Sequence, residues 1–186
     1  MSTVAEPTIK RTRRKPGEPI TNPFTVLIDQ REITGGLPWL FTGMIDEKGR
    51  PLTVPYEVKT MKTADYSIVG YEDRIVVERK SLSDCFGSCG GGRENFEKEH
   101  ERMAELVGRG GYACVIVEAD WRTILTSPPS SSRMNPNAIY QTALSWSIKY
   151  HVHWMAVPGR RFAELTCFRV LRKFYDAEQE RLKGEI

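Results

Sequence analysis

Residues 65–84 read DYSIVGYEDRIVVERKSLSD, and this stretch decides how we expect the chain to fold. Two runs rich in β-branched residues flank a Gly-Tyr-Glu-Asp segment, which is the pattern of an antiparallel hairpin. The second run leads directly into three consecutive charged residues, Glu78, Arg79 and Lys80. A strand that is packed in a core tolerates such charges only when they have partners. The fold must therefore supply partners for these three side chains, or leave them in solvent.

The predicted hairpin brings two carboxylates together. A turn at Gly70–Asp73 would place Asp65 beside Glu78, at the end of the hairpin away from the turn. Successive strand residues point to opposite faces, so Glu78 and Lys80 share one face and Arg79 points to the other. An Asp, a Glu and a Lys on one surface are the groups that metal-assisted phosphodiester hydrolysis needs, with Mg²⁺ or Mn²⁺ as the cation. On spacing alone, however, a surface patch of salt bridges is the better interpretation.

The rest of the sequence alternates between expected strands and helices. Apolar runs predict further strands within residues 24–29, 52–61, 112–120 and 151–159. Helical periodicity and capping residues predict helices within residues 93–111, 135–151 and 159–182. The expected fold class is therefore α/β, with a mixed central sheet flanked by helices.

The chain of 186 residues suggests one domain with a basic arm in front of it. Residues 1–22 are rich in Pro, Thr and basic side chains, and we expect them to be a disordered arm preceding a domain at 23–186. Residues 1–23 hold five basic and two acidic side chains, which leaves 22 of each sign in the remainder. The arm is equally consistent with a solvated tail, a phosphate-binding arm or a nuclear import signal.

Several segments resemble one known family, the XPF-type structure-specific DNA nucleases. Val77–Asp84, reading VERKSLSD, resembles the family's Glu-Arg-Lys-x-x-x-Asp signature. Four other segments resemble the family in its own order: LIDQRE at 27–32, Asp65-Tyr66, Gly91–Arg93 and VIVEAD at 115–120. The resemblance covers about residues 24–120 and implies a restriction-endonuclease-like fold, in a compact, stand-alone form of the family.

The resemblance also implies roles for individual residues. Asp65 and Glu78 would be the principal metal ligands, Asp29 a further acidic residue at the metal, and Lys80 the catalytic lysine. The residues that would contact DNA or brace the site are Arg31, Arg79, Asp84 and Arg93. Glu118 is a further candidate. Ala64 replaces the family's usual glycine, so we expect the backbone before Asp65 to avoid a glycine-only conformation. The family's tandem helix-hairpin-helix module finds no counterpart in this sequence, so a preference for junctions does not follow from it.

The predicted function is a Mg²⁺- or Mn²⁺-dependent DNA endonuclease that acts at branched DNA or at boundaries between single and double strands, in repair, recombination or replication. The alternatives are a catalytically silent DNA-binding or scaffolding domain of the same fold, and a protein-interaction module with a solvated charged face. The apolar face of the last helix suggests a homodimer. No apolar run is long enough to span a membrane or to form a signal peptide, so we expect an intracellular protein, nuclear if eukaryotic.

The remaining residues that could carry chemistry are more simply explained as structural. The four cysteines form only one close pair, Cys85 and Cys89, so buried free thiols are favoured over zinc, with a redox pair as the alternative. The three histidines lie apart from the acidic strand ends. Trp39 and Phe41 are candidates for contacting DNA, although core packing is favoured for both.

Overall fold

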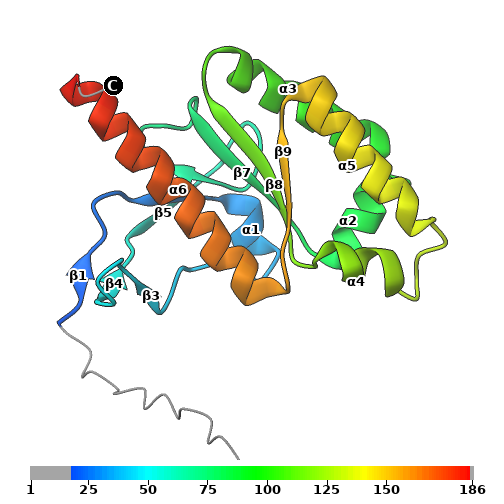
Figure 1. Cartoon of the computed structure of the whole chain (residues 1–186), viewed down its shortest axis with the longest axis horizontal. Coiled ribbons are helices and arrows are strands. Elements are labelled where there is room, and N and C mark those ends of the chain that lie inside the picture. Colours follow the sequence, from blue (N-terminus) through cyan, green and yellow to red (C-terminus); the bar gives the residue numbers. More distant parts are fainter. Residues whose placement is uncertain (1–17, 185–186) are drawn as a thin grey trace, which may run out of the picture.

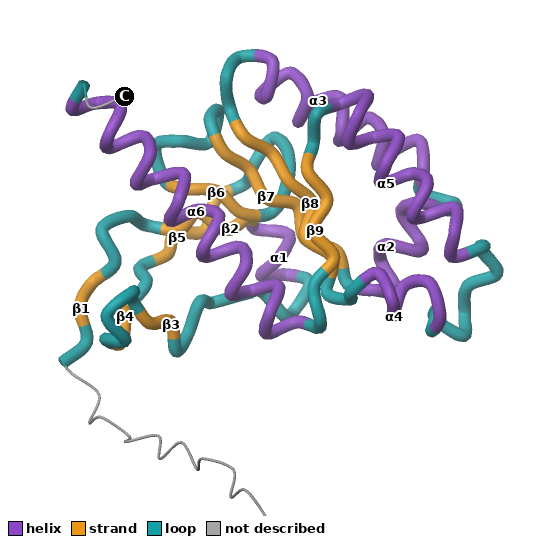
Figure 2. The backbone as a smooth tube through the Cα atoms, in the orientation of Figure 1, coloured by secondary structure: helices purple, strands orange, loops and turns teal. Residues whose placement is uncertain are grey.

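A six-stranded mixed sheet between two layers of helices forms the centre of the molecule (Figures 1 and 2). The computed structural model describes residues 18–184. The strands lie in the order β5 (Tyr56–Lys59), β2 (Val26–Asp29), β6 (Tyr66–Ile68), β7 (Ile75–Lys80), β8 (Tyr112–Val117) and β9 (His153–Ala156). The predicted α/β fold with a mixed sheet flanked by helices is confirmed.

The sheet is antiparallel around β6 and parallel elsewhere. β6 runs antiparallel to both β2 and β7, whereas β8 is parallel to β7 and to β9, and β5 is parallel to β2. Helical crossovers connect the parallel strands β7, β8 and β9, as parallel pairing requires. The expected hairpin is present, with Tyr66 paired with Val77.

Helices cover both faces of the sheet (Figure 1). The three predicted helices are present, as α3 (Arg93–Gly108), α5 (Pro136–Tyr150) and α6 (Arg160–Lys183). The sequence did not predict three shorter helices: α1 (Gln30–Thr34), α2 (Leu82–Cys89) and α4 (Trp121–Thr126). Each of these begins at a side-chain cap, supplied by Asp29, Ser81 and Asp120 respectively. They are five, eight and six residues long, so they offer too few turns for a helical period to be recognised.

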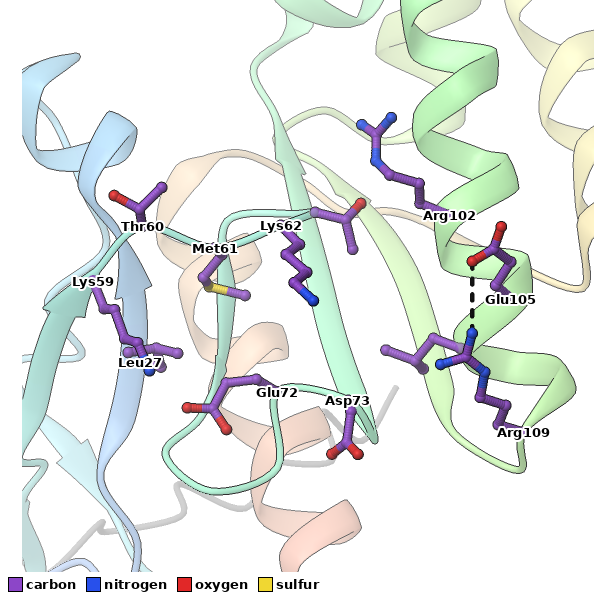
Figure 3. Close-up of a pocket in the computed structure, with 12 residues that line it drawn as sticks. Leu27, Lys59, Thr60, Met61, Lys62, Glu72, Asp73, Arg102, Glu105 and Arg109 are labelled. Atoms are coloured by element: carbon purple, nitrogen blue, oxygen red, sulfur yellow. Dashed lines mark ion pairs between the residues drawn. The ribbon is translucent and has the colours of Figure 1, made fainter.

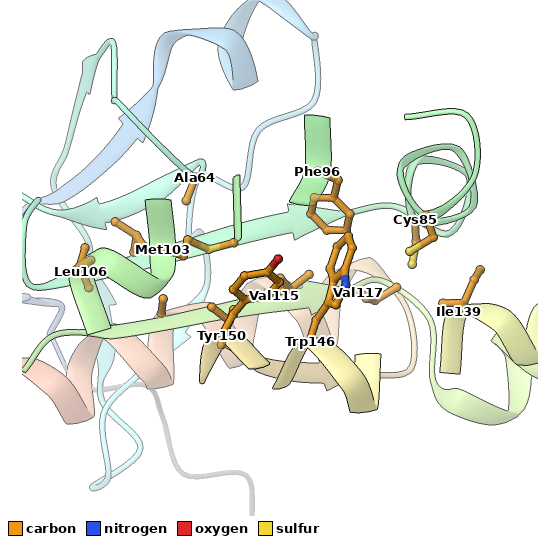
Figure 4. Close-up of a cluster of buried hydrophobic side chains, with 14 of the residues drawn as sticks. Ala64, Cys85, Phe96, Met103, Leu106, Val115, Val117, Ile139, Trp146 and Tyr150 are labelled. Carbon is orange, nitrogen blue, oxygen red and sulfur yellow. The ribbon is translucent and has the colours of Figure 1, made fainter. Parts of the chain in front are cut away.

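Two apolar clusters fill the spaces between the sheet and its helices. Leu27, Val76 and Val115 face α2, α3 and α5, and Figure 4 shows Phe96 and Trp146 among the side chains packed in this cluster. The neighbouring strand residues point the other way, where they pack against α6. The alternation of strand side chains therefore fixes which face carries each charged residue at the strand ends.

A small second sheet changes the boundary predicted for the basic arm. It consists of β1 (Ile20–Thr21), β4 (Pro51–Thr53) and β3 (Met44–Ile45), with β1 parallel to β4. Asn22 continues this contact through its N–H, which donates to the carbonyl of Thr53 at 2.9 Å. Residues 20–22 therefore belong to the folded part, and residues 1–17 of the predicted arm lie outside the described residues.

Not every apolar residue of α5 is buried. Leu144 and Ile148 are exposed, because the buried face of α5 follows Ile139, Ala143 and Trp146. The apolar face of α6, which suggested a homodimer, is instead buried against the sheet through residues such as Phe168 and Leu171. The homodimer stays a prediction, without support from that face. Within residues 18–184, no helix has the length and apolar character of a membrane span.

Candidate active site

The hairpin places Asp65 opposite Glu78. The pairing of Tyr66 with Val77 means that the next residue pair outward is Asp65 and Glu78, and Asp65 N–H donates to the carbonyl of Val77 at 3.1 Å. On the other side, Asp29 N–H donates to the Asp65 carbonyl at 2.8 Å. The ends of β2, β6 and β7 therefore bring three of the predicted acidic residues to one place.

Asp65 is held by the strand that carries Glu78. Its Oδ2 accepts a hydrogen bond from the backbone N–H of Arg79 at 2.8 Å, while its Oδ1 receives none from a described residue. Burial raises the pKa of Asp65 to about 6, the nearby Glu32 carboxylate adds to this rise, and the Arg79 N–H opposes it. One carboxylate oxygen is thus fixed and the other is free for a ligand.

Glu78 and Lys80 share one face, as predicted, and they form an ion pair. Lys80 Nζ also lies 4.7 Å from the centre of the Phe96 ring on α3. Burial and the nearby Asp65 raise the pKa of Glu78 well above its usual range. Burial alone would lower the pKa of Lys80, but the Glu78 carboxylate outweighs it and raises that pKa. Lys80 is therefore a persistent cation, suited to offset negative charge and unsuited to act as a general base.

Glu78 has an unsatisfied oxygen. Its side chain is only 3% exposed, and Oε2 is buried without a hydrogen-bond partner, while Oε1 pairs with Lys80. A buried carboxylate oxygen without a partner is costly unless a ligand satisfies it.

Asp29 is more fully occupied than the other two carboxylates. Its Oδ1 accepts from the N–H of Arg31 at 2.8 Å and from Arg31 Nε at 2.6 Å, and its Oδ2 accepts from Met61 N–H at 2.6 Å. Burial alone would raise the pKa of Asp29, but these hydrogen bonds, led by that from Arg31, lower it. Asp29 therefore caps α1 and anchors the loop after β5, and its predicted contact with a metal stays a prediction.

Ala64 has the conformation that we expected it to avoid. Its φ is 60°, in the left-handed region that favours glycine, and its methyl group is buried in the cluster facing α3. The expectation was wrong because the chain turns from the 59–63 loop into β6 at this residue, whatever side chain it carries.

Sequence reasoning missed Glu99, which α3 brings to the site. Its Oε1 accepts from Ala64 N–H at 3.4 Å, and its charge adds to the rise in the pKa of Asp65 and of Glu78. A signal was present in the sequence, since Glu99 follows Phe96 by three residues and precedes Met103 by four, which places it on the buried face of the helix.

Arg79 points to the opposite face of the sheet, as predicted, and has two acidic partners there. Its Nη1 lies 2.6 Å from Glu32 Oε2, and its Nε lies 2.8 Å from Glu118 Oε1. Its guanidinium carbon lies 5.3 Å from the centre of the Trp39 ring, and Trp39 Nε1 also donates to Glu118. Glu118 is therefore remote from the Glu78 face and serves as the centre of a bracing network.

Two other candidates have structural partners away from the carboxylates. Asp84 Oδ2 accepts from the Ser81 hydroxyl at 2.6 Å, and Ser81 in turn caps α2. Arg93 donates to Thr142 at 2.8 Å and lies over the Trp146 ring of α5. The first contact stabilises the start of α2, and the second ties α3 to α5. Arg31 is different, because its side chain is 63% exposed at the edge of the site.

The aromatic, histidine and cysteine side chains follow the structural interpretation. Trp39 and Phe41 are buried, His100 is buried in the aromatic cluster beside α5, and all four cysteines are buried and free. Cys85 and Cys89 lie on α2 next to each other, without a disulfide.

The carboxylates fit a hard divalent cation that takes part of its coordination from elsewhere. Within residues 18–184, no three His, Cys, Asp or Glu side chains suffice to form a metal site by themselves. Asp65 and Glu78 nevertheless offer one free oxygen each, and their mutual repulsion would be relieved by a cation. Mg²⁺ commonly binds through one or two carboxylates and completes its shell with water and substrate phosphate.

Comparisons with known proteins agree with this fold. The family model described as the ERCC4 domain matches residues 28–167. A solved structure described as XPF from Aeropyrum pernix in complex with DNA is similar, with a TM-score of 0.58, 22% identity, and coverage of 83% of this chain and 66% of that one. A second structure, XPF from Aeropyrum pernix, has a TM-score of 0.58, 23% identity, and coverage of 80% and 60%. No curated protein sequence matches the chain.

The chain belongs to the ERCC4 domain family, because the family model covers most of its length. The predicted resemblance to XPF-type nuclease domains is confirmed. The chain spans about two thirds of the length of the XPF structures that it matches, so the activities of those whole proteins do not transfer with the fold.

Proposed function

We propose that this protein is a divalent-metal-dependent DNA endonuclease that hydrolyses phosphodiester bonds at the site formed by Asp65, Glu78 and Lys80. The observation that carries the proposal is the unsatisfied Oε2 of the buried Glu78, which lies opposite a second carboxylate and beside a lysine that stays protonated. A fold has no structural reason to keep such an arrangement, since each buried charge costs stability.

Each residue has a separate task in this mechanism. A Mg²⁺ or Mn²⁺ ion bound by Asp65 and Glu78 would polarise the phosphate and lower the pKa of a bound water. Lys80 supplies a fixed positive charge for the phosphate oxygens as negative charge builds up in the transition state. The N–H of Arg79 keeps the Asp65 carboxylate in position, and Arg31, exposed at the edge of the site, is placed to contact a neighbouring phosphate.

The family supports DNA as the substrate, and one of the similar structures is described as a complex with DNA. We propose branched DNA, or boundaries between single and double strands, as the preferred substrate, and DNA repair, recombination or replication as the setting. The matched XPF structures extend beyond this chain, so the preference for a particular junction rests on the family resemblance alone.

The test is cleavage of labelled linear, flapped, forked and four-way-junction DNA with Mg²⁺ or Mn²⁺. Asp65→Asn and Lys80→Ala should each reduce the rate by roughly 100-fold or more. Asp176→Asn and Lys173→Ala, which change exposed ion pairs of α6, are the matched controls and should cleave at the wild-type rate. Metal-dependent cleavage by the Asp65→Asn variant at the wild-type rate would overturn the assignment. DNA binding without cleavage by the wild type would instead favour a scaffolding domain.

A further inference from the structure

A groove lies beside the candidate active site, between the 59–63 loop and the second half of α3 (Figure 3). Its volume is about 540 Å³. Leu27, Met61 and Leu106 line it, and all three belong to the apolar cluster on the α3 side of the sheet. Glu78 and Lys80 point to the same side, because they alternate with Val77 and Arg79 along β7. The groove and the site therefore share one face of the sheet.

Both walls of the groove carry residues that adjoin the site. On the loop wall, Met61 N–H binds Asp29 Oδ2 at 2.6 Å, and the lining residue Thr63 is two residues before Asp65. On the helix wall, Arg102 follows Glu99 by three residues, so both lie on the same side of α3. The groove is thus a neighbouring surface for a polymer that reaches the site.

Basic side chains stand on both walls of the groove. Lys59, the last residue of β5, and Lys62 stand on the loop wall, and Arg102 of α3 and Arg109 just after its end stand on the helix wall (Figure 3). All four are exposed. Lys59, Lys62 and Arg102 make no ion pair with any residue in the described range. Arg109 makes only a loose contact, at 3.7 Å, with Glu105. Exposed cations that lack protein partners are free to neutralise phosphates.

The charge changes sign at the far end of the groove. Glu72 and Asp73 line it from the β6–β7 turn, where neither forms an ion pair with a described residue. Asp65 lies at the opposite end of the same hairpin, so the acidic pair is far from the scissile position along the strands. Figure 3 shows these two carboxylates on the turn, with Lys62 on the loop above them.

We propose that this groove binds the backbone of one DNA strand next to the scissile phosphate, with Lys62 and Arg102 contacting its phosphates and Glu72 and Asp73 ending the contact. The inference rests on the proposed function for its substrate, DNA, and adds where one strand runs. Among residues 18–184, no aromatic side chain lines the groove, so base stacking by them does not contribute there and the contact does not depend on base sequence.

The first experiment measures DNA binding in EDTA, where no cleavage occurs, by the fluorescence anisotropy of labelled single-stranded and forked DNA. A Lys62→Ala/Arg102→Ala variant is compared with a Lys48→Ala/Arg169→Ala variant, which loses the same charge outside the groove. The groove variant should bind about tenfold more weakly, and its plot of log affinity against log salt should be shallower by roughly 1.4–1.8, the value for two lost phosphate contacts. The control should stay within about twofold of the wild type.

A second variant tests the acidic end. Glu72→Gln/Asp73→Asn removes two negative charges and should tighten binding of the same DNA at low salt, because the backbone is no longer repelled there. Unchanged or weaker binding would overturn the assignment of Glu72 and Asp73. Glu72 is half-buried, and all the other substituted side chains are exposed. The melting temperature of each variant should therefore lie within about one or two degrees of that of the wild type.

The outcomes separate this inference from the proposed function. If the wild type cleaves DNA but the groove variant binds as its control does, the groove inference fails and the nuclease stands. If the wild type binds without cleaving and the groove variant binds weakly, the nuclease proposal fails and the groove stands. Absence of any DNA binding by the wild type would overturn both. Labelled polyglutamate serves as a further probe. If the groove variant lost binding of polyglutamate but still bound DNA, the groove would be a site for an acidic polypeptide instead.

Discussion

The backbone N–H of Arg79 donates to Asp65 Oδ2 at 2.8 Å, while the Arg79 side chain binds Glu32 and Glu118 on the opposite face of the sheet. One residue therefore connects the candidate catalytic face with a bracing network on the far side. The main chain of Arg79 acts on the site, and its side chain acts on the fold. These two roles are separable by mutation, because a substitution removes only the second.

Arg79→Ala should lower the free energy of unfolding by about 2–4 kcal/mol, because it leaves Glu32 and Glu118 partly buried without their shared cation. Arg74→Ala removes one of two cations that pair with Glu178, which keeps Arg181 as a partner, so it should cost about 1 kcal/mol or less. Urea denaturation of both variants measures the difference. Equal losses in the two variants would contradict the bracing role of Arg79.

The carboxylates of Asp65 and Asp29 should respond in opposite directions to conversion into amides. The pKa of Asp65 is raised by burial, so the fold bears the cost of this charge. Asp65→Asn should therefore stabilise the protein in EDTA at pH 7 by about 1–2 kcal/mol, whereas it should slow metal-dependent cleavage by roughly 100-fold or more. Hydrogen bonds from Arg31 and Met61 lower the pKa of Asp29 in spite of burial. Asp29→Asn should therefore lower the free energy of unfolding of the protein by about 1.5–3 kcal/mol.

Thermal and urea unfolding of the two variants, both in EDTA, provide the measurement. A gain in stability on removing a charge from a candidate active site is the sign that the charge serves function rather than folding. If Asp65→Asn proved less stable than the wild type, the carboxylate would be a structural group and its assignment to catalysis would lose this support.

The hairpin, and with it the meeting of Asp65 and Glu78, was predictable because period-two alternation and a four-residue turn are local signals. The long helices were predictable for the same reason. Glu99 was harder, since its distance from Asp65 depends on how α3 packs across the sheet. The partners of Arg79 are harder still, because Glu32 and Glu118 lie 47 and 39 residues away in the sequence. Local patterns carry no information about such pairings.

The left-handed backbone conformation of Ala64 was likewise not predictable from the local sequence. A strain of about 1–2 kcal/mol is associated with a residue other than glycine in this region. Ala64→Gly relieves this strain but loses a buried methyl group and adds chain entropy to the unfolded state, so its unfolding free energy should stay within about 1 kcal/mol of the wild type.

Ala113→Gly is the matched control for Ala64→Gly, because Ala113 is equally buried but lies in β8 without a positive φ. Ala113 has no strain to relieve, so Ala113→Gly should lower the free energy of unfolding by about 1.5–2 kcal/mol. Urea denaturation of both variants gives the strain at Ala64 as the difference between them. Equal losses would mean that the left-handed conformation costs nothing at this position.

His100 should make the stability of the fold depend on pH. Its ring lies among Phe96, Trp146 and Trp154, and burial lowers its pKa to about 4. Below pH 6.5 the unfolded chain takes up a proton that the folded chain does not, so stability is lost as the pH falls from 6.5 towards 4. The loss from this residue should be about 3 kcal/mol.

His100→Phe keeps an aromatic ring in the cluster and removes the titrating group, together with a buried Nε2 that has no partner. The wild type should therefore lose about 3 kcal/mol more stability than this variant between pH 7.5 and pH 4, measured by urea denaturation at closely spaced pH values. The carboxylates titrate in both proteins, so their contribution cancels in the difference. Parallel stability curves for the two proteins would show that His100 gains its proton as readily in the folded state as in the unfolded one.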